Sequence, residues 1–161
     1  MIVLGFDPGS QITGYGIIRH LNNKSTYIAS GCIRLPKVDM PSRLLQLHQA
    51  ARQIIEQYSP DVTAIEKVFV KNNVDSALKL GQARGVLLCA MAEASSDIFE
   101  YSPREIKQAV VGYGGADKAQ VQTMVQSLLS LSKKPQADAA DALAVAICHV
   151  NTNNFLLKLK G

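Results

Sequence analysis

The chain has 161 residues, three cysteines and a formal net charge of +4 at pH 7. A chain of this length forms one domain that buries enough surface to fold without disulfides or a structural metal, and an odd number of cysteines fits a reducing compartment. It has no basic segment at its start and no apolar run of membrane-spanning length, so we expect a soluble, cytoplasmic protein with no membrane partner.

The first half of the chain predicts a strand-rich region. The expected elements are three strands, a helix and a fourth strand, at residues 2–6, 15–20, 26–35, 41–58 and 62–65. The first strand is a continuous apolar run that stops at the turn residues Asp7, Pro8 and Gly9, which is typical of a buried strand. The fourth strand follows Pro60 and ends at Glu66.

The second half of the chain predicts helices around one further strand. The expected elements are a helix, a strand and three more helices, at residues 74–93, 98–101, 103–111, 121–129 and 136–150. Three strands followed by alternating helices and strands predict an α/β fold, in which helices flank both faces of a mixed five-stranded sheet. We expect one domain over residues 1–157 and a short basic tail over residues 158–161.

Four acidic residues lie where a carboxylate is costly unless a partner compensates it. Asp7 and Glu66 end apolar strands, and Asp138 and Asp141 are the only charged residues in the apolar segment 137–147. We expect the first strand at the centre of the sheet with the fourth parallel beside it, so Asp7 and Glu66 would meet at the carboxyl ends of neighbouring strands. Burial raises the cost of charging the two aspartates unless a cation is near.

Each of these acids alone has an ordinary alternative explanation. An acid at a strand end is often a turn-former, and Asp138 could favour a helix N-terminus. A single divalent-cation site explains all four acids together, and ligands that are all oxygen favour Mg²⁺, with Mn²⁺ as a substitute, over zinc. Outside these four, the chain has 17 basic and nine acidic residues, a balance that suits a polyanionic substrate.

Several segments of the chain together resemble the RuvC family of Holliday junction resolvases. They are Asp7 to Gly16, Ala64 to Glu66, Asp75 to Gly85, Lys107 to Val121 and Asp138 to Leu143. The resemblance implies a ribonuclease H-like nuclease domain and a structure-specific endonuclease of DNA recombination and repair. Its products would have 5′-phosphate and 3′-hydroxyl ends. By the resemblance, the four acids are the catalytic residues and the ligands of two Mg²⁺ ions per active site.

The resemblance also indicates which residues hold DNA. Phe69 follows Glu66 in a loop where basic and aromatic residues alternate, so its ring could stack on an unpaired base; a core phenylalanine is the alternative. Lys107 and Lys118 match basic residues that the family uses at DNA, and we add Arg104 and Lys71 as weaker candidates. The expected partners are four-way junction DNA and the branch-migration proteins RuvA and RuvB.

A two-fold homodimer is the expected working unit, because a four-way junction has near two-fold symmetry and resolving it needs two cuts. We expect much of the interface on the helix over residues 74–93, where Ala77, Gly81 and Gly85 recur at four-residue spacing. Glycine within a helix costs about 1 kcal/mol relative to alanine and so calls for a packing reason. The alternative is that these residues let the helix lie close to its own sheet.

Three other functions compete with this prediction. An ATPase of the actin or sugar-kinase type would use residues 7–16 as a phosphate loop, but it would need a second domain of similar kind. A ribonuclease H-like nuclease acting on another nucleic acid would share the fold and the metal chemistry. A non-enzymatic junction-binding module would need a basic surface but not four buried acids.

Overall fold

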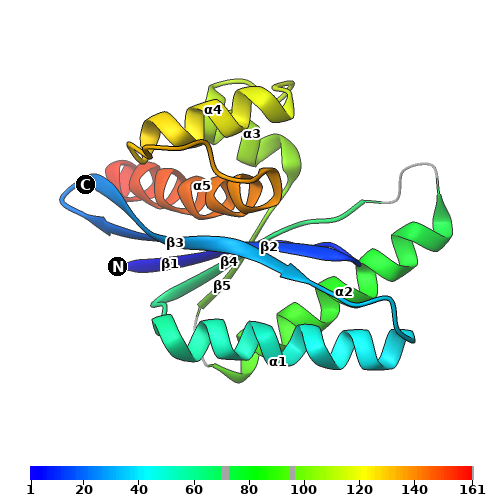
Figure 1. Cartoon of the computed structure of the whole chain (residues 1–161). Helices are drawn as coiled ribbons and strands as arrows, with labels where there is room; N and C mark the ends of the chain where they lie inside the picture. Colours follow the sequence, from blue (N-terminus) through cyan, green and yellow to red (C-terminus); the bar gives the residue numbers. More distant parts are fainter. Residues whose placement is uncertain (70–72, 95–96, 161) are drawn as a thin grey trace.

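In the computed structural model, the chain folds into a five-stranded mixed sheet with helices on both faces (Figure 1). The structure describes all residues except 70–72, 95–96 and 161, and it describes residues 154–160 by their backbone alone. The elements in chain order are β1 (Ile2–Asp7), β2 (Ile12–Leu21), β3 (Lys24–Arg34), α1 (Met40–Tyr58), β4 (Val62–Glu66), α2 (Val74–Glu93), β5 (Asp97–Tyr101), α3 (Pro103–Val111), α4 (Lys118–Leu128) and α5 (Ala137–Lys160).

The strands lie in the order β3-β2-β1-β4-β5, so β1 is central as predicted. β1 and β2 pair antiparallel, as do β2 and β3, whereas β4 runs parallel to both β1 and β5. Phe6 on β1 pairs with Ile65 on β4. Because the strands are parallel and in this register, the residues that follow, Asp7 and Glu66, emerge together at the same edge of the sheet. The predicted mixed five-stranded sheet is confirmed.

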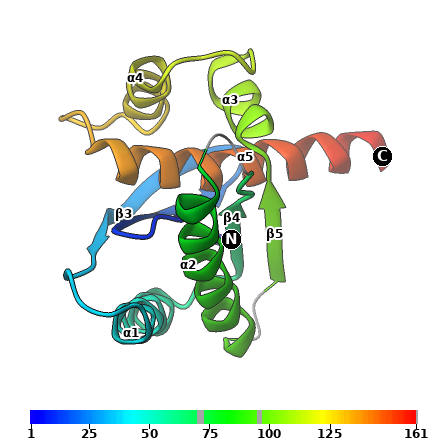
Figure 2. The ribbon, with the colours of Figure 1, turned by 90° about the vertical axis from the view of Figure 1, so that its right-hand side faces the viewer.

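Each face of the sheet is covered by its own group of helices (Figure 2). Val3 and Leu4 are both fully buried but belong to different cores, because successive side chains of a strand point to opposite faces. Leu4 lies in a core with α1 and α2, and Val3 lies in a core with α3, α4 and α5. The predicted helices on both faces are therefore confirmed.

Helix α5 lies directly on the backbones of β1 and β2. A Cβ atom added to Gly16 would come within 2.6 Å of the Leu143 backbone nitrogen, and one added to Gly14 would overlap the Asp138 carbonyl group. Only glycine permits this close approach. It fixes the first turns of α5 over the strand end that bears Asp7.

The end of α5 differs from the prediction. The sequence predicted a helix ending near Val150, and the residues after it, asparagine and threonine, are poor helix formers. The helix instead continues to Lys160, so residues 158–160 of the expected basic tail are helical. One reason is a tertiary contact, in which the Asn151 side-chain amide donates to the Ala109 carbonyl of α3 at 3.0 Å. The predicted domain extent of residues 1–157 remains a prediction. None of the described helices combines the length and apolar character that a membrane span requires.

Candidate active site

The four carboxylates predicted from the sequence line one cavity of about 640 Å³. Asp7 is the last residue of β1 and Glu66 the last of β4, while Asp138 and Asp141 lie in the first turns of α5. Three elements that are distant in the sequence therefore meet at this cavity. The parallel β1–β4 pair supplies two carboxylates, and the close packing of α5 on the glycines of β2 supplies the other two.

Charges of like sign dominate the electrostatics of the cavity. Burial, followed by a hydrogen bond shared with Glu66 and the charges of Glu66 and Asp141, together raise the pKa of Asp7 to about 9, although the charge of Lys118 opposes them. Burial also raises the pKa of Asp141, although the ammonium group of Lys118 opposes this effect. The carboxylates thus remain undercompensated by the positive charges of the chain, which is the condition under which carboxylates take up protons or bind cations.

The chemistry of this donor set fits a hard divalent cation. All four acidic side chains offer carboxylate oxygens, and none of the described residues that line the cavity is a histidine or cysteine. Mg²⁺ or Mn²⁺ prefers such a set of oxygen ligands. Within the described part of the chain, no three acidic, histidine or cysteine side chains are already arranged to hold a metal ion. Asp7 and Glu66 instead share a hydrogen bond, so a bound cation would replace the proton between them.

Basic and aromatic candidates surround the carboxylates. Lys107 and Lys118 both line the cavity, and the Lys118 ammonium nitrogen lies 3.5 Å from a carboxylate oxygen of Asp141. Phe69 also lines the cavity and is 61% exposed, so the alternative of a core phenylalanine is wrong. Arg104 is not among the cavity residues; it lies against Gly114, in the loop between α3 and α4. Lys71 lies outside the described residues.

Two of the three predicted interface residues of α2, Gly81 and Gly85, lie on the side of the helix away from the chain's own sheet. A Cβ atom added to Gly81 or Gly85 would meet nothing within 4 Å. The alternative in which these glycines let α2 lie close to the sheet is therefore wrong. Ala77 is half-buried and lines the active-site cavity. Leu78, nearby on the same helix, is 64% exposed.

Two arginines that sequence reasoning missed brace the strand ends and loops of the site. The Nε of Arg84 on α2 donates to the backbone carbonyl of Glu66 at 3.0 Å, and its guanidinium also pairs with Glu100 on β5. Arg43 on α1 donates to the carbonyl of Ser10, in the loop that follows Asp7. The available signal for Arg84 was a basic residue next to the buried Ala83 in a helix of small and apolar residues.

A buried threonine closes the loop after Asp7. Thr13 is fully buried, and its hydroxyl donates to the Gly9 carbonyl at 3.0 Å and accepts from the Gly9 amide at 3.2 Å. These two bonds tie the loop back to the start of β2. The position of Asp7 therefore depends on side chains from β2 and α1 as well as on its own strand.

Comparisons with known proteins agree on one family. Residues 3–149 match the family model described as crossover junction endodeoxyribonuclease RuvC. A protein of that description from Vibrio vulnificus (strain YJ016) is 58% identical over 160 residues, which cover 99% of this chain and 92% of the relative. Another, from Pseudoalteromonas translucida (strain TAC 125), is 57% identical with the same coverage.

Solved structures give the same result. The structure described as T. thermophilus RuvC in complex with Holliday junction substrate superposes with a TM-score of 0.89 at 30% identity and covers 96% of each chain. The yeast mitochondrial Holliday junction resolvase Ydc2 superposes with a TM-score of 0.74 at 15% identity, covering 97% of this chain and 80% of that one. The second likeness is one of fold alone.

Proposed function

We propose that this chain, which belongs to the RuvC family of crossover junction endodeoxyribonucleases, cuts the phosphodiesters of four-way DNA junctions at the cavity lined by Asp7, Glu66, Asp138 and Asp141. The observation that supports this site most directly is the convergence of four carboxylates from three elements in one cavity. The raised pKa of Asp7, about 9, reflects first its burial and then the neighbouring carboxylates of Glu66 and Asp141. We propose two Mg²⁺ ions as the cofactor, with Mn²⁺ as a substitute.

The residues of the cavity have distinct roles in this mechanism. When bound, a pair of divalent cations supplies a water of lowered pKa and stabilises the oxygen that leaves the phosphorus. Asp7 and Glu66, fixed at neighbouring strand ends, would hold the cations together with Asp138 and Asp141 of α5. The bond between the phosphorus and the 3′ oxygen is the one that is broken, which leaves 5′-phosphate and 3′-hydroxyl ends.

Lysines of the cavity neutralise the phosphate that the carboxylates would otherwise repel. The pKa of Lys118 is raised, chiefly by the charge of Asp141, so its side chain stays protonated. Its distance of 3.5 Å from Asp141 places a positive charge beside the carboxylates, where an incoming phosphate can use it. Lys107 adds a second positive charge at the same cavity. Arg104 and Lys71 are proposed as contacts farther along the DNA.

Phe69 is proposed to stack on a base that is unpaired at the junction centre. Its ring lines the cavity and is 61% exposed. A ring this exposed does not stabilise the fold through burial, so its position calls for another role. Stacking of a base on such a ring contributes about 1–3 kcal/mol, and it does not depend on base identity. The ring would thus help to recognise a junction rather than a continuous duplex.

The working unit is proposed to be a two-fold homodimer that joins along α2. The outward position of Gly81 and Gly85 leaves room for a second backbone, and the exposed Val74 and Leu78 supply apolar surface on the same helix. A symmetric dimer presents two active sites related as the two scissile strands are. We also propose that the protein works in the cytoplasm with the branch-migration proteins RuvA and RuvB.

Cleavage of a synthetic junction tests this function. A four-way junction with one labelled strand at a time should be cut in two strands of like polarity when Mg²⁺ is present. An RNA–DNA hybrid of the same sequence and a continuous duplex should not be cut measurably. Efficient cleavage of the hybrid with none of the junction would favour the ribonuclease H-like alternative. Binding of the junction with no cleavage in Mg²⁺ or Mn²⁺ would favour the non-enzymatic module.

A further inference from the structure

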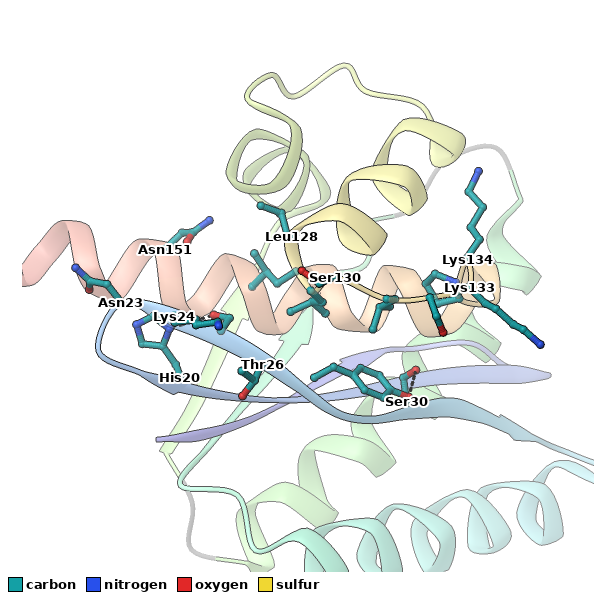
Figure 3. A pocket seen from close by; sticks show the side chains of 17 residues that line it. His20, Asn23, Lys24, Thr26, Ser30, Leu128, Ser130, Lys133, Lys134 and Asn151 are labelled. Carbon is teal, nitrogen blue, oxygen red and sulfur yellow. Dashed lines mark hydrogen bonds between the residues drawn. The ribbon is translucent and has the colours of Figure 1, made fainter.

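A second cavity, of about 890 Å³, lies outside the active site (Figure 3). The hairpin of β2 and β3 forms one side of it, and the loop from α4 to α5 forms the other. Ile147 and Asn151 of α5 lie between the two sides. We call this cavity the arm groove. Nothing in the cleavage mechanism above uses its residues.

The arm groove is lined by positively charged side chains and by hydrogen-bond donors. Lys24, Lys133 and Lys134 line it, and none of its lining residues, all of which are described, is acidic. Figure 3 shows the side chains of Lys133 and Lys134 extending away from the ribbon of their loop. Hydroxyl groups also line the groove, at Ser25, Thr26, Tyr27, Ser30, Ser130 and Ser132. A surface of ammonium and hydroxyl groups without carboxylates suits phosphate oxygens.

The length of the arm groove fits a chain of phosphates better than one anion. Asn23 and Lys134 lie toward opposite ends of it along α5 (Figure 3). From the first residue of α5, Ala137, to Asn151 the helix rises roughly 20 Å at 1.5 Å per residue. One DNA strand advances about 3.4 Å along the duplex axis per phosphate, so a groove of this length can contact several phosphates of one strand.

The basic end of the arm groove adjoins the active site through the start of α5. Pro135 lines the groove, and Asp138, three residues later, lines the active-site cavity. This connection is braced, because the Gln122 side chain donates to the Pro135 carbonyl at 2.7 Å and the Cys32 thiol donates to the Gln136 side chain at 3.2 Å. DNA that leaves the active site toward this side therefore meets Lys133 and Lys134 on a fixed loop.

We propose that the arm groove binds the phosphate backbone of one junction arm, away from the cleavage centre. This inference rests on the junction-cleaving function but not on the metal ligands or on the dimer interface. The groove would contribute sequence-independent affinity and would set the direction in which the arm leaves the active site. An acidic segment of a protein partner is a different occupant, which the experiment below separates from DNA.

The test removes charge from both sides of the contact. The protein variant is Lys24→Gln/Lys133→Gln/Lys134→Gln, and the control is Lys37→Gln, an exposed lysine that lines neither cavity. The DNA variants replace successive arm phosphates by neutral methylphosphonates. Affinity for a labelled junction is measured without divalent cations over a range of salt concentrations.

We expect the triple variant to bind the junction on the order of tenfold more weakly than wild type, and its salt-dependence slope to fall by about 2–3, near 0.9 for each lost contact. The control should match wild type in both. A short run of arm methylphosphonates should weaken wild type but not the triple variant, and this coupling identifies the contact.

Equal junction affinity and an equal salt-dependence slope for wild type and the triple variant would overturn the proposal. An acidic protein segment would then be the alternative occupant to test. If the triple variant does not fold, the methylphosphonate scan on wild type decides alone: no sensitive arm positions outside the cleavage centre would refute the groove. Failure of wild type to cut the junction would refute the proposed catalytic site instead, because this assay measures binding without cleavage.

Discussion

Two cavities share the N-terminal end of α5, and their charges are opposite. Asp138 lines the active-site cavity with three other carboxylates, whereas Pro135, three residues earlier, lines an arm groove that has three lysines and no acid among its described residues. A polyanion is repelled by the first surface and attracted by the second. The difference suits a domain that both holds and cuts DNA: under the proposals above, the lysines would supply the affinity and the carboxylates would bind the metal ions.

Lys118 lies at the boundary between these two tasks. Its ammonium group is 3.5 Å from Asp141 and partly compensates the carboxylates. Under the proposed mechanism, the same charge would be available to a phosphate once cations occupy the site. Single substitutions should have their largest effects in the acidic cavity and smaller effects outside it.

Replacing one carboxylate should separate cleavage from binding. Asp7→Asn, Glu66→Gln, Asp138→Asn and Asp141→Asn should each lower Mg²⁺-dependent cleavage by on the order of a thousandfold or more, because each removes a charged oxygen ligand. Junction binding should stay equal or tighten, since repulsion of the phosphates is reduced. Single-turnover cleavage and junction affinity measure the two effects.

Asp97→Asn is the matched control for these variants, because Asp97 is exposed on β5 and lines neither cavity. It should cut like wild type. Ca²⁺ in place of Mg²⁺ should support binding but not efficient cleavage, because its looser coordination misplaces the water. Substantial cleavage by Asp7→Asn in Mg²⁺ would exclude Asp7 from the site.

A bulky side chain on the outward face of α2 should weaken the proposed dimer. A Cβ atom added at Gly81 or Gly85 would meet none of the described residues within 4 Å, so the protomer of either leucine variant should fold normally. In a close-packed interface each inserted side chain costs about 1–3 kcal/mol, and two-fold symmetry applies that cost twice. Sedimentation velocity should show dissociation of the dimer, and the junction cleavage assay should show loss of paired nicks. A variant that stays dimeric and cuts both strands would move the interface elsewhere.

Removing the Phe69 ring should slow cleavage far more than it lowers stability. Loss of about 1–3 kcal/mol of stacking corresponds to roughly a fivefold to hundredfold decrease in junction cleavage. The melting temperature of Phe69→Ala should change little, because the ring is exposed. Phe6→Ala is the contrasting variant: Phe6 is fully buried, and its loss should cost about 3–5 kcal/mol of unfolding free energy. Equal destabilisation by the two variants would contradict this account of Phe69.

The smallest effect is expected at Arg84, which bonds the Glu66 backbone but does not line the cavity. Arg84→Gln should lower the cleavage rate at saturating enzyme roughly tenfold or less, through displacement of Glu66, because the whole hydrogen bond from a charged group contributes about 1.5 kcal/mol and only part of it acts on the rate. Junction affinity should be nearly unchanged, and Arg84→Lys should restore part of the rate. Arg52→Gln is the control, since Arg52 forms its ion pairs on the helical layer away from the site. A matching loss of affinity and rate would indicate a DNA contact instead.

The sequence predicted the acidic cavity well for a physical reason. Asp7 and Glu66 end apolar runs, and parallel strands joined by a right-handed crossover must place their carboxyl ends together. Asp138 and Asp141 interrupt a segment that is otherwise apolar. Buried strands and buried helices leave a strong hydrophobic pattern, and a charge within such a pattern is conspicuous even without coordinates.

The rest depends on contacts between distant segments, which no local pattern records. Arg84 bonds a carbonyl 18 positions earlier in the chain, and the arm groove combines a hairpin near residue 25 with a loop near residue 133. The predicted end of α5 was also wrong. Asn151 donates a hydrogen bond to α3, a contact that stabilises the helix where the propensity of the nearby residues is poor. Lysines at loops gave no such signal, since most exposed lysines are simply solvated.

The central claim is that the four carboxylates form one site for divalent cations, and counting bound Mn²⁺ tests it most directly. Mn²⁺ binding can be followed by electron paramagnetic resonance with a junction whose scissile phosphates resist cleavage. Wild type and Asp97→Asn should each bind two Mn²⁺ ions per protomer, whereas Asp7→Asn and Asp141→Asn should lose one or both. Equal binding by wild type and all four carboxylate variants, or no binding by wild type, would contradict the account.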